Sequence, residues 1–203
     1  MTSWWKIRRN SLKTLVLLVV MALLVTSVAA QTITQRFDVE DGKSTNLSTY
    51  VQGLPGGIEL WGHNLNTPTP MYRIGMMKKT SFGKAGGYFA TKNGQNWVNP
   101  RLIFVSKMFG PGVKIVVDEY EPITSGAKRI VTLSDAYKLC PVSKTVSVGP
   151  GLNGSWTRDG AKWLKGAIVI TAKINKSDSL YVRWNCIGND APDSLRMEWS
   201  HSL

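Results

Sequence analysis

The sequence of 203 residues predicts an all-β protein built as an antiparallel β-sandwich. Glycine and proline interrupt short apolar runs along the whole chain, and no stretch keeps the 3.6-residue period of a long amphipathic helix. Several runs instead alternate apolar and polar residues, as strands with one buried face do. Many short strands separated by turn residues are typical of two packed antiparallel sheets rather than of strands joined through helices.

Eleven segments have the length and composition of strands. They cover residues 32–39, 57–61, 71–77, 87–92, 101–109, 113–120, 129–133, 145–148, 167–174, 180–187 and 194–203. The segment 134–139 has a weak pattern for a helical turn. Apolar residues occupy both faces of 167–174, which is typical of a strand in the middle of a sheet.

Two turns have specific chemistry. Asn93 and Gly94 tolerate the positive φ angles of a type I′ turn, which predicts a hairpin with Ala90 opposite Trp97.

The second turn is predicted at Asp159 and Gly160, where the same chemistry would set Trp156 directly opposite Trp163. A short helix over 161–165 is the alternative.

The last ten residues alternate strictly. One parity of this segment carries Leu195, Met197, Trp199, His201 and Leu203. Because successive side chains of a strand point to opposite faces, the terminal strand has one apolar face and one polar face. We expect the apolar face to pack on the core, and the strand to need a partner that keeps its end from fraying.

The first 30 residues have the three parts of a secretory signal peptide. Residues 1–13 carry four basic residues and no acid, 14–25 form an apolar run, and 26–30 are small. The apolar run is shorter than the roughly 20 residues that cross a membrane as a helix. The sequence therefore predicts an exported chain with a signal peptide at 1–30 and one domain at 31–203, the alternative being an uncleaved signal anchor.

The chain has two cysteines, Cys140 and Cys186. In an exported protein such a pair can oxidise and remain oxidised, so we expect one disulfide, with two free thiols as the alternative. The cysteines and the two histidines, His63 and His201, do not have the spacing of a zinc site. No metal and no cofactor is predicted.

The charge is unevenly distributed. Four of the 25 basic residues lie in 1–30, which leaves 21 basic residues against 13 acidic residues in the rest of the chain. No acid occurs between Glu59 and Asp118, where eight cations are interleaved with aromatic residues. Such a field attracts anions such as acidic sugars, whereas export argues against nucleic acid. The candidate anionic-ligand surface comprises Arg73, Lys78, Lys79, Lys84 and Lys92. The alternative is that these cations only solvate the outer faces of strands.

No catalytic constellation is evident, so the chain is not expected to be an enzyme. Neither histidine lies near a nucleophile motif such as G-x-S-x-G. Asp118, Glu119 and Glu121 form one acidic cluster ahead of a proline, which is typical of a solvated loop. The glycine-rich segments lack the residue order of phosphate-binding loops.

Together these features resemble the subunits of bacterial fimbriae that are assembled by the chaperone and usher route. The resemblance rests on the signal peptide, the size of the β domain, the cysteine pair, and two alternating ends, Q-T-I-T-Q-R-F-D-V at 31–39 and S-L-R-M-E-W-S-H-S-L at 194–203. It implies an immunoglobulin-like sandwich that lacks one strand. A chaperone strand, and later the N-terminal extension of the next subunit, would complete it.

The resemblance also implies a role for each end of the chain. The donor segment would present Ile33, Phe37 and Val39. The strand-addition edge would present Leu195, Met197, Trp199, His201 and Leu203. Ser202 replaces the usual penultimate aromatic residue and the cysteines lie late, which favours a minor, tip or divergent subunit. Type IV pilins also have late cysteines, but this chain lacks their glycine before an apolar run.

The resemblance predicts a fimbrial subunit or adhesin that mediates surface attachment. Its partners would be other fimbrial subunits, a periplasmic chaperone and an outer-membrane usher, with a host glycan or another anion as ligand. It would pass through the periplasm to the cell surface. The alternative is a self-contained secreted module that binds carbohydrates or anions, either lectin-like or an inhibitor.

Overall fold

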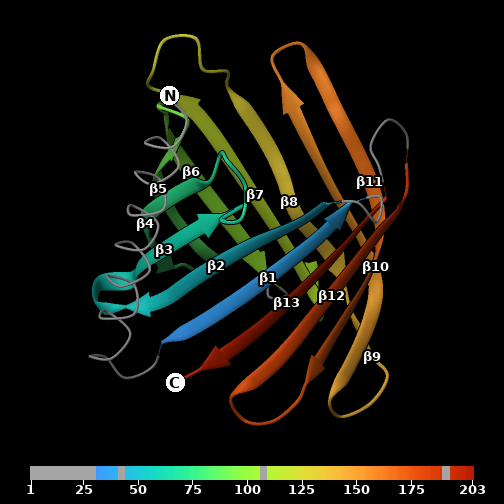
Figure 1. Cartoon of the computed structure of the whole chain (residues 1–203). Coiled ribbons are helices and arrows are strands. Elements are labelled where there is room, and N and C mark those ends of the chain that lie inside the picture. Colours follow the sequence, from blue (N-terminus) through green and yellow to red (C-terminus); the bar gives the residue numbers. More distant parts are fainter. Residues whose placement is uncertain (1–30, 41–43, 106–108, 189–192) are drawn as a thin grey trace, which may run out of the picture.

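The computed structural model describes residues 31–40, 44–105, 109–188 and 193–203. These residues form one antiparallel sheet whose strands surround a single central axis (Figure 1). The predicted signal peptide at 1–30 lies outside the described residues. None of the helical segments in the described ranges is long and apolar enough to cross a membrane.

The described strands are connected mostly by short turns, with one 3-10 turn, η1, between the second and third. The elements are β1 (Thr32–Glu40), β2 (Ser44–Leu54), η1 (Pro55–Gly57), β3 (Ile58–His63), β4 (Met71–Lys79), β5 (Gly83–Lys92), β6 (Gln95–Val105), β7 (Val113–Pro122), β8 (Ile130–Lys138), β9 (Cys140–Pro141), β10 (Val146–Thr157), β11 (Gly160–Lys173), β12 (Asp178–Ile187) and β13 (Ser194–Ser202).

The sheet closes on itself. Its strand order is β11-β12-β13-β1-β2-β3-β4-β5-β6-β7-β8-β10-β9, and β10 also pairs with β11. Because β9 is a two-residue strand beside β10, the closed ring is a barrel of twelve antiparallel strands. The predicted immunoglobulin-like sandwich, complete or incomplete, is therefore wrong. A closed ring has no second sheet to pack against, and closure removes the open edges of an ordinary sheet.

The two faces of the strands have the opposite polarity to those of a soluble sandwich. Large apolar side chains lie on the outside, and Phe89 and Trp184 are 46% and 50% exposed. Charged side chains lie inside, where Arg183 and Asp118 are 0% and 1% exposed. The expectation that the apolar face of the terminal strand packs on a core is wrong for the same reason, since Trp199 is 43% exposed on the outer face.

The terminal strand finds both of its partners in its own chain. β13 pairs with β12 on one side and with β1 on the other, and Phe37 lies opposite Met197. Figure 1 shows β1, β13 and β12 side by side in the barrel wall. The proposed donor segment and the proposed strand-addition edge therefore pair with each other and close the barrel. Neither is left to accept or donate a strand in another molecule.

The hairpin at Asn93 and Gly94 is confirmed. Their φ angles are 52° and 74°, and Ala90 lies opposite Trp97 in the pairing of β5 with β6. A Cβ atom added at Gly94 would meet no atom of other residues within 4 Å, so this glycine is favoured by its positive φ rather than by crowding.

The second predicted turn is displaced by one residue. Thr157 pairs with Gly160, so Arg158 and Asp159 form the two-residue turn between β10 and β11. A bulge between Ser155 and Trp156 shifts the register, and Trp163 lies opposite Ser155 rather than Trp156.

Two other segments also differ from the prediction. Residues 134–139, predicted as a helical turn, belong mostly to β8, and β2 occupies a segment for which no strand was predicted.

The predicted disulfide is absent, because Cys140 and Cys186 are both free. Cys140 belongs to β9 and Cys186 to β12, and these strands are separated by β10 and β11. Three strand spacings amount to about 14 Å. The Cα atoms of a disulfide must lie within about 7 Å, so the barrel wall itself keeps the two thiols apart.

Candidate functional site

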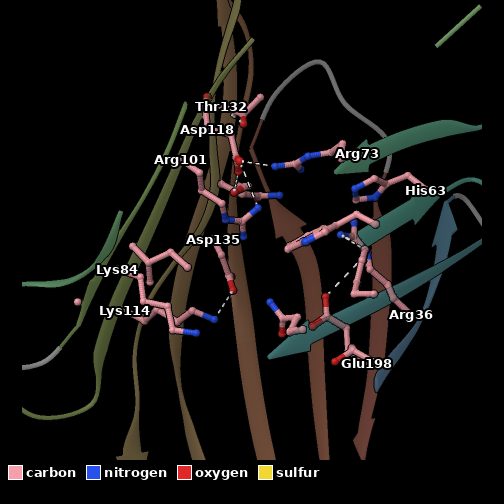
Figure 2. Close-up of a pocket in the computed structure, with 18 of the residues that line it drawn as sticks. Arg36, His63, Arg73, Lys84, Arg101, Lys114, Asp118, Thr132, Asp135 and Glu198 are labelled. Carbon is pink, nitrogen blue, oxygen red and sulfur yellow. Dashed lines mark hydrogen bonds and ion pairs between the residues drawn. The ribbon is translucent and has the colours of Figure 1, made fainter. Parts of the chain in front are cut away.

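The inward-facing side chains surround a cavity of about 770 Å³ inside the barrel (Figure 2). Its lining comes from strands on all sides, including β1, β4, β6, β7, β8 and β13. Alternate residues of each strand reach it because successive side chains point to opposite faces of the sheet. The closed ring thus gathers polar residues that are far apart in the sequence.

Cations outnumber carboxylates in this lining. The cationic side chains are Arg36, Arg73, Lys79, Lys84, Arg101, Lys114 and Arg196. The carboxylates are Asp118, Asp135 and Glu198. The cavity therefore carries a formal surplus of positive charge, and its walls limit screening by bulk water.

One charged cluster joins β4, β6, β7 and β8. The Oδ1 atom of Asp118 lies 3.0 Å from Nη2 of Arg73 and 3.2 Å from Nη1 of Arg101. The hydroxyl of Ser134 donates to Oδ2 of the same carboxylate at 2.6 Å. Figure 2 shows the two arginines converging on this carboxylate.

Aromatic rings support the two arginines of this cluster. The guanidinium of Arg73 lies 4.8 Å from the centre of the Trp61 ring and 4.5 Å from that of Tyr88. The guanidinium of Arg101 lies 4.5 Å from the centre of the Trp61 ring. Glu59 holds the two rings in place, because it accepts hydrogen bonds from the Trp61 indole at 3.2 Å and from the Tyr88 hydroxyl at 2.5 Å. These contacts hold the cations by stacking as well as by charge.

A second cluster lies where β1 meets β13. Asp38 accepts hydrogen bonds from Nε of Arg36 at 2.6 Å and from Nε of Arg196 at 2.9 Å. Arg36 also donates to the hydroxyl of Tyr50 at 3.0 Å and lies 3.9 Å from Glu198. The strand pair that closes the barrel therefore also carries part of the charged lining.

A third cluster is centred on Asp135. Its Oδ1 atom lies 2.5 Å from Nη1 of the fully buried Arg183 and accepts a hydrogen bond from the Tyr181 hydroxyl at 2.7 Å. The other carboxylate oxygen lies 3.8 Å from the ammonium group of Lys114.

Several guanidinium donors inside the barrel have no acceptor among the described residues. They are Nε of Arg73, Nε of Arg101 and Nη2 of Arg183. A buried donor without an acceptor is costly, and an anion with several oxygens would satisfy such donors with short charge-assisted hydrogen bonds. The described residues contain no cluster of side chains suited to hold a metal ion. The described lining therefore offers cationic hydrogen-bond donors.

The structure brings together only part of the predicted anionic-ligand surface. Arg73, Lys79 and Lys84 line the cavity, and Lys79 lies directly opposite Lys84 in the pairing of β4 with β5. Lys78 and Lys92 are not among the described lining residues. The basic segment is therefore one wall of an interior rather than an outer binding surface.

The acidic cluster at the end of β7 is divided between the two faces of the sheet. Asp118 is buried inside, which corrects the expectation that it belongs to a solvated loop. Glu119 and Glu121 instead pair with Arg129 on the other face. The alternation of the strand could have separated them, because Asp118 has the opposite parity to its two neighbours in the cluster.

Arg36, Arg101, Arg183 and Arg196 were not predicted as site residues. All four lie at inward positions of strands, and Arg36 and Arg196 have the polar parity of the two chain ends. That parity was visible in the sequence, but it was assigned to the solvent side.

The sequence matches no protein-family model, and no curated protein matches it. Solved structures do match. A KdgM porin in complex with disordered oligogalacturonate aligns with a TM-score of 0.56 at 11% identity, covering 85% of this chain and 99% of the porin. A NanC porin structure aligns with a TM-score of 0.52 at 9% identity, covering 86% of this chain and 100% of the porin. The chain shares the fold of these porins.

This likeness overturns the fimbrial interpretation. A porin-like closed barrel leaves no role for other fimbrial subunits, a chaperone strand or an usher as completing partners. The alternative of a secreted lectin-like module or inhibitor is also wrong, because its apolar residues would face water. The fold agrees with an exported protein but not with a fimbrium or a secreted soluble protein. Porins are channels and not enzymes, in agreement with the expectation that this chain is not an enzyme.

Proposed function

We propose that this protein is an outer-membrane channel that passes anionic solutes, with acidic oligosaccharides as the substrate class. The observation that carries the proposal is the reversed polarity of the barrel: a cationic, partly unsatisfied interior enclosed by an apolar exterior. Residues 1–30 would direct its export.

The exterior has the character of a lipid-facing surface. Large apolar side chains that are exposed lie on β1, β4, β5, β6, β10, β11, β12 and β13: Phe37, Ile74, Phe89, Val98, Leu102, Leu152, Leu164, Ile168, Trp184, Met197 and Trp199. The barrel strands other than β3 have 9 to 14 residues, and a tilted strand crosses a bilayer in roughly 9–11. Closure satisfies the backbone hydrogen bonds that lipid cannot.

The interior favours negatively charged solutes. Among the described lining residues, seven cationic side chains face three carboxylates, and the Nε donors of two of these cations, Arg73 and Arg101, lack an acceptor in the described residues. Oligogalacturonate, which is named with one of the porins of similar fold, carries one carboxylate on each sugar unit. A uronate oligomer therefore fits the charge of the lumen.

The proposal is tested with the purified mature protein in planar lipid bilayers. In a gradient of KCl we expect stepwise conductance. The reversal potential should shift toward the equilibrium potential of chloride, because fixed cations concentrate anions in the lumen. Trigalacturonate should reduce the chloride current, whereas the neutral trimer maltotriose at the same concentration should not. Raising the salt should weaken the block, since charge interactions are screened. An absence of conductance, or a cation-selective one, would contradict the proposal.

A pair of variants locates the effect within the barrel. Lys84→Glu reverses a charge that lines the cavity and should reduce the anion selectivity. Lys78→Glu is the matched control, because Lys78 lies on the neighbouring strand but is not among the described lining residues. Equal effects of the two substitutions would mean that the selectivity arises outside the lumen.

A further inference from the structure

We infer that Asp118 sets how strongly this channel holds anionic solutes, because its carboxylate competes with them for Arg73 and Arg101. The inference rests on the proposed function and identifies the residue that tunes it.

The carboxylate of Asp118 already occupies the position of an anionic ligand. A single oxygen, Oδ1, accepts hydrogen bonds from Arg73 at 3.0 Å and from Arg101 at 3.2 Å. The other oxygen receives the hydroxyl of Ser134 at 2.6 Å, and the side chain is 2% exposed. A solute carboxylate that approached the two arginines would meet this internal carboxylate first.

The ion pair with Arg73 runs across the interior rather than along the wall. Arg73 belongs to β4 and Asp118 to β7, with β5 and β6 between them. Along the wall the two strands are about 14 Å apart. Figure 2 shows the two side chains extending toward each other from opposite sides of the view. The pair therefore joins two separate parts of the cavity lining.

The two arginines keep unused donors while they hold Asp118. Each gives it one terminal nitrogen, and the Nε atoms of Arg73 and Arg101 have no acceptor among the described residues. A guanidinium binds a carboxylate best through two parallel hydrogen bonds. Asp118 uses neither arginine in that way, so a solute carboxylate that displaced it could form the stronger arrangement with two parallel hydrogen bonds.

Loss of the Asp118 charge should leave the arginines in place. Arg73 remains stacked on Trp61 and Tyr88 and donates to the hydroxyl of Tyr120 at 3.2 Å. Arg101 remains stacked on Trp61. The site would then present two guanidinium groups without their internal competitor.

Glu59 offers a matched control for the removal of one negative charge. It is also buried, on the inward side of β3, but its hydrogen-bond donors are the neutral groups of Gln52, Trp61 and Tyr88. Glu59→Gln therefore changes the charge of the interior by the same amount as Asp118→Asn without releasing a guanidinium from a salt bridge. The amide oxygen of the glutamine can still accept hydrogen bonds.

The experiment compares the two variants in planar bilayers, with trigalacturonate as the probe. Asp118→Asn should lower the dissociation constant for current block by about tenfold, the effect of about 1.4 kcal/mol, and lengthen each blocking event. Glu59→Gln should change it much less. Asp118→Glu, which keeps the charge, should remain close to wild type, and Ser134→Ala should fall between wild type and Asp118→Asn.

Each outcome decides the inference. Equal block constants for Asp118→Asn and Glu59→Gln would overturn it while leaving an anion-selective channel intact. Weaker block by trigalacturonate in Asp118→Asn would also overturn it, since the carboxylate would then be organising the site rather than competing for it. If Asp118→Asn does not insert, Ser134→Ala decides by the same comparison. A wild-type channel without anion selectivity would contradict the proposed function. The role of Asp118 would then be tested separately, by comparing the chloride selectivity of Asp118→Asn with that of Glu59→Gln.

Discussion

At the scale of the residue, the buried charge of Arg183 is held by partners on two strands. Arg183 is 0% exposed, and its guanidinium donates to Asn185 at 3.0 Å and to Asp135 at 2.5 Å. Removing one partner of such a pair leaves the other charge buried without compensation. The resulting loss of stability is larger than the net contribution of the intact pair.

We therefore predict that Asp135→Asn lowers the free energy of unfolding. The substitution leaves the buried Arg183 without its carboxylate, at a cost of about 2 kcal/mol. This value lies below the usual range for buried pairs because the neighbouring lumen admits water. Urea unfolding in lipid vesicles, followed by tryptophan fluorescence, measures the change. The exposed ion pair of Arg129 with Glu121 is the control, and Arg129→Ala should have a much smaller effect. Equal losses would mean that burial of Arg183 does not matter.

At the scale of the element, each strand is one wall segment with a wet side and an apolar side. In β13, Met197 and Trp199 lie outside, whereas Arg196, Glu198 and Ser200 line the cavity. Pairing with β1 and β12 fixes this orientation, because a shift of one residue would exchange the two faces along the whole strand.

We predict opposite tolerance of a lysine on the two faces of β13. Met197→Lys places a charge on the outer face near the middle of the strand and should destabilise the protein in lipid by about 2–4 kcal/mol. Ser200→Lys places the same charge inside the polar lumen and should cost clearly less. Unfolding free energies of both variants in lipid vesicles give the comparison. A larger loss for Ser200→Lys would contradict the assignment of the two faces.

At the scale of the whole molecule, closure makes the two ends of the described chain neighbours. β1 and β13 pair along their full length, from Thr32 opposite Ser202 to Glu40 opposite Ser194. These contacts are the most distant in sequence, so their formation completes the barrel and brings Arg36 together with Asp38 and Arg196 in the lumen. The pairing of β1 with β13 thus closes the barrel wall and also assembles this part of the charged lining.

A cross-link tests this closure directly. In a protein with Cys140→Ser and Cys186→Ser, the double substitution Phe37→Cys and Met197→Cys places two thiols at directly opposite positions, with Cα atoms about 4.5–5.5 Å apart. We expect an intramolecular disulfide, seen as faster migration of the unfolded monomer on a non-reducing gel. Dimers linked through the same residues would instead indicate strand exchange between molecules. The control pair Phe37→Cys with Trp184→Cys should not cross-link, since β13 separates the strands.

The sequence by itself determined the local features of this protein. The period of two at 194–203, the turn at Asn93 and Gly94, and the basic segment between Glu59 and Asp118 are all present in the structure as strand, hairpin and cationic wall. These features depend on neighbouring residues alone, so they can be recognised without knowing the fold.

Only the tertiary structure decided which face is the inside. Alternation shows that a strand has two different faces, but it is unchanged when inside and outside are exchanged, and the surrounding medium decides between them. The partner of the last strand, the separation of Cys140 from Cys186, and the meeting of Arg73 with Asp118 all depend on ring closure. Closure joins residues through pairings that no local pattern encodes, and for that reason the interior charge of the barrel was mistaken for a solvent-exposed surface.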